Sequence, residues 1–103
     1  MTKTPCAPPV DRLEQLVRKA RKFRQKGEPR KALQTLREAC LLDDQCAWAW
    51  TLYGSYLTHF HHPVEAQKAY RHALWLRRMS GDERRQRSTQ ALLDRLAATS
   101  CAA

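Results

Sequence analysis

The residue types that could bind a metal ion gather near the middle of the chain. They are Cys40, Cys46, His59, His61, His62 and His72. Structural zinc sites usually place close Cys or His pairs on both sides of a loop, and the Cys40-x5-Cys46 spacing is too wide for such a pair. The three clustered histidines fall where a turn between helices is expected. We therefore predict no metal ion.

Acidic residues that could act as general acids or bases are scattered along the chain. Glu38, Asp43, Asp44 and Glu65 form no recognisable acid/base motif, and no serine or cysteine lies in a nucleophile-elbow sequence. The sequence therefore predicts a non-catalytic protein that needs no cofactor.

The charge of the chain is basic and unevenly distributed. Lys and Arg number 19 against 10 Asp and Glu, which gives a net charge of +9. Residues 12–31 hold nine basic and two acidic groups, residues 71–87 hold six and two, and residues 32–70 hold two and four. Two basic ends around a slightly acidic middle favour an acidic partner, although the same charges also suit a solvated helix surface.

Nucleic acid is the competing partner class for so basic a chain. The sequence contains no zinc finger, no RNA-recognition signature and no glycine-rich phosphate loop. Basic charge alone would give unspecific binding that weakens with salt. A protein or peptide partner is therefore favoured over nucleic acid.

Helical periodicity predicts an all-α fold of about five helices. Asp11 with Glu14 and Ser80 with Glu83 resemble capping boxes that start the first and fifth helices. Prolines stand at the expected starts of the second and fourth helices, where a missing N–H is tolerated. The expected helices run over residues 11–27, from residue 29 to about 42, through residues 50–57, over residues 63–78 and over residues 83–98.

The segments outside these helices bound the organisation of the chain. Residues 1–10 are polar and Pro-rich and are expected to form a flexible leader before a single domain at residues 11–98, with a flexible tail at residues 99–103. No apolar run is long enough to span a bilayer, and no signal segment is apparent. We therefore expect a cytoplasmic protein with no membrane contact and reduced thiols, in which Cys40 is a small buried apolar residue.

Shifting the chain by 34 residues aligns the first predicted helix pair with the second. Pro29 falls on Pro63 and Ala32 on Ala66. A fixed period of this length in a helical chain indicates stacked supersecondary units, in which small residues allow close approach and bulky ones fill the space. The predicted packing residues are Leu16, Ala20, Phe23, Ala32, Leu36, Ala39, Trp50, Tyr53, Gly54, Leu57, Ala66, Tyr70 and Ala73.

The second unit resembles a tetratricopeptide repeat (TPR), a helix-turn-helix of about 34 residues with the signature W-x2-L-G-x2-Y…A-x3-F. It reads Trp50-x2-Tyr53-Gly54-x2-Leu57, followed by Ala66-x3-Tyr70. The first unit departs further, since Lys19 and Ala20 replace the leucine and glycine of the signature. The resemblance implies antiparallel helical hairpins, with repeat one at residues 13–46, repeat two at residues 47–80 and a capping helix at residues 82–98.

The resemblance also implies a ligand groove along the third helix, beside its packing stripe. The partner-binding residues that it suggests are Trp48, Thr51, Ser55 and His59, with Arg21, Arg24 and Arg85 from the neighbouring units. An exposed tryptophan, hydroxyl groups and arginines suit a peptide that carries carboxylates and one apolar anchor.

Two functional interpretations follow from this resemblance. The first is a scaffold or adaptor that binds an acidic peptide or protein through a basic, Trp-containing groove. The second is a small assembly or secretion-type chaperone whose partner covers the outer helix surfaces, including Trp75. Because two repeats are fewer than the roughly three usually needed for independent stability, homo-oligomerisation or stabilisation by a partner is also expected.

Overall fold

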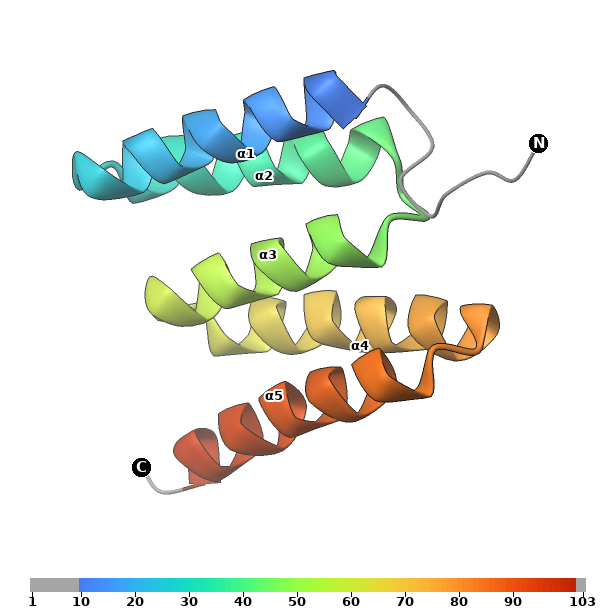
Figure 1. The fold of residues 1–103 in the computed structure, drawn as a ribbon. Coiled ribbons are helices and arrows are strands. Elements are labelled where there is room, and N and C mark those ends of the chain that lie inside the picture. Colours follow the sequence, from blue (N-terminus) through green and yellow to red (C-terminus); the bar gives the residue numbers. More distant parts are fainter. Residues whose placement is uncertain (1–9, 102–103) are drawn as a thin grey trace.

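The computed structural model describes residues 10–101, and that part of the chain is helical with short connections (Figure 1). The five helices are α1 (Val10–Gln25), α2 (Pro29–Leu42), α3 (Ala47–His59), α4 (Pro63–Ser80) and α5 (Glu83–Cys101). The predicted all-α fold of about five helices is therefore confirmed. Among these five, none combines the length and the apolar character that a bilayer crossing requires. The expected leader, apart from its last residue, and residues 102–103 lie outside the described residues.

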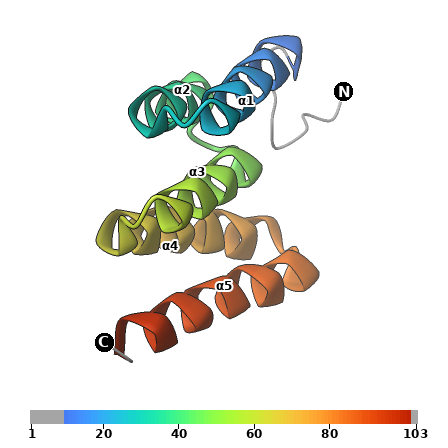
Figure 2. The ribbon, with the colours of Figure 1, turned by 90° about the vertical axis from the view of Figure 1, so that its left-hand side faces the viewer.

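The helices stack as successive antiparallel hairpins. α1 packs on α2, α3 packs on both α2 and α4, and α5 packs on α4. In Figure 1, α1, α3 and α5 lie in front of α2 and α4, and the side view in Figure 2 shows the stack descending from the first hairpin to α5. We call α1, α3 and α5 the front layer and α2 and α4 the rear layer. The helix α3 joins the two hairpins because it packs against a rear helix of each.

The turns inside the two hairpins repeat each other at the 34-residue spacing. Gly27 and His61 both take the left-handed conformation, with φ of 74° and 65°. In each turn the next residue donates its N–H to the carbonyl five residues earlier, at 2.9 and 2.8 Å, which is a Schellman ending. Pro29 and Pro63 then stand in the first turn of the following helix. The repeat seen in the sequence is thus also a repeat of backbone geometry.

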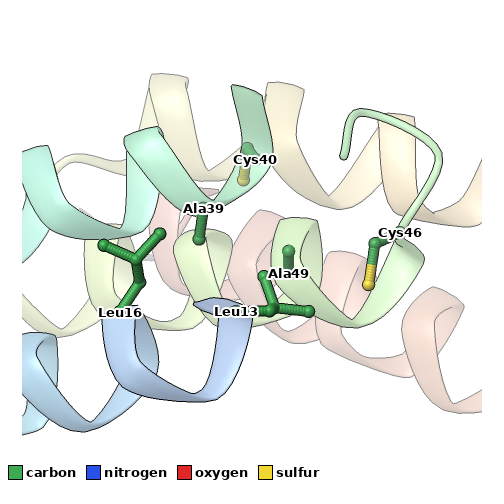
Figure 3. Close-up of a cluster of buried hydrophobic side chains, with 6 residues drawn as sticks. All are labelled: Leu13, Leu16, Ala39, Cys40, Cys46 and Ala49. Atoms are coloured by element: carbon green, nitrogen blue, oxygen red, sulfur yellow. The ribbon is translucent and has the colours of Figure 1, made fainter. Parts of the chain in front are cut away.

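Buried apolar side chains join the first hairpin to α3. Leu13 and Leu16 of α1 meet Ala39 and Cys40 of α2 and the start of α3, and each of these residues is at most 5 % exposed (Figure 3). Ala49 and Cys46 supply the contacts from α3 and from the residue before it. Small residues on α2 and α3 let the helices approach closely while the leucines fill the space.

Most of the predicted packing residues lie in or against three buried apolar clusters. Phe23, Trp50 and Tyr53 are half-buried and pack against those clusters, and Tyr53 packs against all three. The others are buried, namely Leu16, Ala20, Ala32, Leu36, Ala39, Gly54, Leu57, Ala66, Tyr70 and Ala73. Trp50 and Tyr53 of α3 therefore connect the clusters to one another, together with Leu33 of α2, which packs against two of them.

The helices α3 and α4 approach closely where Gly54 faces the ring of Tyr70. A Cβ atom at position 54 would lie 2.7 Å from both Cδ1 and Cε1 of that ring. Such a separation is well inside van der Waals contact, so a larger residue at position 54 would push the helices apart or displace the ring. Glycine is required here by close approach and not by backbone conformation.

The start of α5 differs from the prediction. Ser80 belongs to α4, and its hydroxyl donates to a carbonyl of that helix at 3.0 Å. Gly81 ends α4 in the left-handed conformation with φ of 76°, and the carboxylate of Asp82 then accepts the N–H of Arg85 at 3.1 Å. The predicted capping box of Ser80 and Glu83 is therefore wrong, because the left-handed glycine delays the cap to Asp82.

The bounds of α1, α4 and α5 differ from those expected. α1 already includes Val10 and Asp11, so Asp11 lies inside the helix and does not precede it. α4 continues to Ser80 where residue 78 was expected, and α5 continues to Cys101 where residue 98 was expected. Alanine-rich sequence near the C-terminus favours helix and continues it into the expected tail.

The Gly54–Tyr70 contact gives a testable prediction for stability. Gly54→Ala is expected to lower the free energy of unfolding by about 1–3 kcal/mol because the added Cβ meets the ring. Intrinsic helix propensity opposes this effect by only about 1 kcal/mol. Urea denaturation followed by circular dichroism measures the difference. In a Tyr70→Leu background the same Gly54→Ala change should cost less, and an unchanged or higher stability of Gly54→Ala alone would contradict the steric account.

Candidate functional site

A groove opens in the front layer between α3 and α5, and we call it the front groove. Its volume is about 330 Å³. Tyr70 and Leu96 are only 3 % and 7 % exposed, which makes the base of the groove apolar, while Ser55, His59 and Arg95 are exposed at its edges. The lining residues are Ser55, Thr58, His59, Tyr70, Leu92, Arg95, Leu96 and Thr99. An apolar base with a polar edge is typical of a site that binds one apolar side chain and orients the groups around it.

The polar side chains of the front groove differ in what they can offer a ligand. The hydroxyls of Thr58 and Thr99 donate to the carbonyls of Gly54 and Arg95, at 2.9 and 3.0 Å, so only their oxygens remain as acceptors. The guanidinium of Arg95 makes no ion pair with another residue in the described part of the chain. The front groove thus combines acceptors for N–H groups with one positive charge that is available to a carboxylate.

The structure places the predicted residues of α3 in two groups. Ser55 and His59 line the front groove. Thr51 is half-buried, and its hydroxyl donates to the Ala47 carbonyl at 2.8 Å. Trp48 is 41 % exposed at the start of α3 and does not line the groove. At about 1.5 Å per residue, Trp48 and His59 lie about 16 Å apart along the helix.

The three predicted arginines do not converge on one point. The guanidinium of Arg24 lies 5.1 Å from the centroid of the Tyr56 ring, a cation–π contact that draws it onto α3. Arg85 forms an ion pair with Asp82 at 3.2 Å, and the two line a separate depression at the start of α5. Arg21 is exposed on α1. Arg85 is therefore already occupied by a carboxylate of its own helix start.

Thr89, about one helical turn after Arg85 on α5, lies inside the protein and not in the front groove. Its side chain is fully buried and accepts a hydrogen bond from Nη1 of Arg77 at 2.8 Å. Burial lowers the pKa of Arg77, the positive charge of Arg85 lowers it further, and Asp82 opposes both effects. This hydrogen bond fixes α5 against α4 and so positions the α5 side of the front groove.

Sequence reasoning missed Arg95, Leu96 and Thr99 as groove residues. Their signal was present, because Leu92, Arg95, Leu96 and Thr99 follow one face of a helix at three- and four-residue spacing. The 34-residue repeat instead predicts Arg85, which aligns with Thr51 and Val17, and an expected helix end at residue 98 leaves Thr99 outside α5. In the structure α5 places Arg95 and Leu96 opposite Ser55 and His59, and its additional residues add Thr99 to the same wall.

The histidines take separate structural positions. His72 lies 4.4 Å from Trp50 between ring centroids, and its Nε2 is 3.3 Å from the Asp44 carbonyl oxygen. His59 packs edge-on against Phe60 at 4.9 Å, and His61 forms the hairpin turn. Within residues 10–101, no three His, Cys, Asp or Glu side chains are close enough to hold a metal ion.

Cys40 of α2 and Cys46, which directly precedes α3, have different states. Cys40 is 1 % exposed, and burial raises the pKa of its thiol from 9.0 to about 12, so it stays protonated and shielded. Cys46 is disulfide-bonded and fully buried. The expectation of reduced thiols is therefore wrong for Cys46, because the pairing of a thiol depends on the sulfur atoms that the fold brings together.

Comparison of the chain with protein-family models, with curated proteins and with solved structures finds no significant match. Functional proposals for this chain therefore rest on its own residues and geometry.

The buried thiol of Cys40 leads to a prediction about reactivity. Iodoacetamide at pH 8 is expected to leave Cys40 unmodified in the folded protein and to alkylate it once guanidinium chloride unfolds the chain, because the native thiol is shielded and protonated. Peptide mapping by mass spectrometry measures the modification. Rapid alkylation of Cys40 without denaturant would contradict this prediction.

The raised pKa of Cys40 also makes the stability of the protein depend on pH. The contribution of this thiol to the free energy of unfolding is present below pH 9.0 and is lost as the pH rises toward about 12.

Proposed function

We propose that this protein is a non-catalytic, TPR-like interaction module that binds an acidic, extended peptide of a partner protein in the front groove. The observation that carries the proposal is the combination of an apolar base, formed by Tyr70 and Leu96, with the available guanidinium of Arg95. The recurrence of the same turn geometry at Gly27 and His61 supports the TPR-like part of the proposal.

The spacing along α3 defines the kind of peptide that would fit. Trp48 offers an exposed apolar surface about 16 Å from the level of His59, a distance that about five residues of extended chain would span. Thr58 and Ser55 supply oxygen acceptors for peptide N–H groups between these points. The expected ligand therefore carries an apolar residue for Trp48 and, about five residues away, an acidic residue for Arg95.

The rest of the module favours the same ligand through charge. Arg21 is exposed and Arg24 is held over Tyr56 on the side of α3 that faces α1. A net charge of +9 attracts acidic segments and speeds their association at low ionic strength. Close contacts at the groove then decide which acidic segment stays bound.

Selection from a displayed library of unstructured 12-residue peptides tests this function. Wild-type protein is expected to enrich sequences with Asp or Glu about five residues from an aromatic or aliphatic residue. Enrichment of basic sequences, or of sequences without this spacing, would contradict the proposal.

Variants of the front groove give a quantitative prediction for an enriched peptide. Arg95→Glu is expected to weaken its binding about tenfold or more, since a charged hydrogen bond contributes about 1.5–3 kcal/mol and the new charge repels the ligand. Trp48→Ala is expected to weaken binding through loss of the apolar anchor. Fluorescence anisotropy measures both, and circular dichroism checks the fold.

Lys22→Glu is the matched control for the charge reversal. Lys22 is exposed on α1 and does not line the front groove, so its variant changes net charge by the same amount. Its effect should be small at physiological salt. Equal losses for Lys22→Glu and Arg95→Glu would mean that net charge and not the groove governs binding.

A further inference from the structure

A second depression lies on the rear layer, between α2 and α4, and we call it the rear trough. Its volume is about 490 Å³. α2 and α4 form its walls, and Trp50 and Tyr53 of α3 lie between them. Its lining residues are Arg37, Cys40, Leu41, Trp50, Tyr53, Glu65, Lys68, Ala69 and His72. It shares no lining residue with the front groove.

Aromatic rings run from the trough to the outer surface. Ring centroids of Tyr53 and Trp50 are 6.3 Å apart, those of Trp50 and His72 are 4.4 Å apart, and those of His72 and Trp75 are 6.1 Å apart in a stacked arrangement. Nε1 of Trp50 donates to the Asp44 carbonyl at 3.0 Å, which fixes this indole. The rings therefore form a surface that needs little ordering when a ligand binds.

Large apolar side chains flank this ring surface and face solvent. Leu41 on α2 is 72 % exposed, Trp75 on α4 is 52 % exposed, and Met79, one helical turn after Trp75, is 70 % exposed. α3 lies between α2 and α4 and keeps these two walls apart. A channel between two helices suits a helix of a ligand that has an apolar face. Exposure of this kind around a shaped depression is typical of a protein-binding surface.

We propose that the rear trough binds an amphipathic α-helix of a partner protein, with an apolar row that contacts Leu41 and the aromatic rings and with acidic residues on both sides of that row. The acidic flanks follow from the charges of the walls. Arg37 and Lys68 line the trough, and Arg71 is exposed one turn before Trp75, whereas Glu65 is the acidic lining residue. Acidic flanks would pair with these cations on both walls.

The same charges disfavour a second copy of this chain as the occupant. The charged lining residues are Arg37, Lys68 and Glu65, so two rear layers placed face to face would bring two surfaces of net positive charge together. Like charges at a buried contact are unfavourable. An acidic helix from another protein satisfies the apolar side chains and the cations together.

This surface is separate from the one in the proposed function. Ser55 and His59 lie on the front side of α3, whereas Trp50 and Tyr53 lie on its rear side. The two sites can therefore be tested with different variants, and failure of one leaves the other intact.

Selection from a displayed library of helical peptides, randomised on one face, tests the rear trough. Wild-type protein is expected to enrich helices with apolar residues at i, i+3 or i+4 and i+7 and with Asp or Glu beside them. Leu41→Glu is expected to weaken the enriched peptide about tenfold or more, because it places a negative charge on the apolar contact and repels the acidic flanks. Trp75→Ala should weaken it through loss of ring contact, and fluorescence anisotropy measures both.

Val64→Glu is the matched control, since Val64 is also an apolar residue of the rear layer, is 65 % exposed and does not line the trough. Val64→Glu and Arg95→Glu should leave the affinity of the helical peptide nearly unchanged. Three results would overturn the proposal: no enriched helical pattern, enriched helices with basic flanks, or equal losses for Leu41→Glu and Val64→Glu. Light scattering completes the test, because a wild-type dimer that Leu41→Glu dissociates would assign the trough to a second copy.

Discussion

The close approach of α3 to α4 at Gly54 and Tyr70 is the contact on which both surfaces of this protein depend. With no side chain at position 54, the Tyr70 ring lies against the backbone of α3 and remains buried inside the second hairpin, next to Leu96 of α5. That ring also forms part of the base of the front groove. The separation of α3 and α4 that it sets determines, on the other side of α3, how deeply Trp50 and Tyr53 lie within the rear trough. The absence of a Cβ atom at Gly54 therefore affects the geometry of both the front groove and the rear trough.

The two layers use the same helical repeat for different chemistry. In the front groove the exposed edge is polar, with serine, threonine and histidine on α3 and an available arginine on α5. In the rear trough the walls carry leucine and aromatic rings, with charges placed along the edges. An extended peptide has backbone groups that must be hydrogen-bonded, whereas a helix has satisfied its own and offers an apolar row. This difference in the ligand's own hydrogen bonding is why we assign the two surfaces to different partners.

Much of the fold could be predicted because its determinants are local and repeated. Pro29 and Pro63 mark helix starts through a property of the residue itself, and helical periodicity predicted the five helices. The 34-residue spacing also holds for the turns, although Gly27 and His61 are different residues in the same backbone conformation. The site was harder to predict, since repeat position says nothing about competition between side chains. Arg85 forms an ion pair with Asp82, and Thr89 accepts a hydrogen bond from Arg77. Arg95 does not fall on the positions that the repeat aligns, and its guanidinium remains available to a ligand.

The closing helix α5 differs from the front helices before it, because no second helix follows it within the described residues. Its attachment to α4 rests on apolar contacts through Leu96 in its C-terminal half and on the hydrogen bond from Arg77 to Thr89 in its N-terminal half. Buried polar contacts of this kind fix register more than they add stability, because Arg77 loses hydration that Thr89 only partly replaces. The register matters for recognition, since sliding or rotating α5 would move Arg95 away from Ser55 and His59. In this account Arg77 contributes to binding indirectly, by holding the helix that carries the charge.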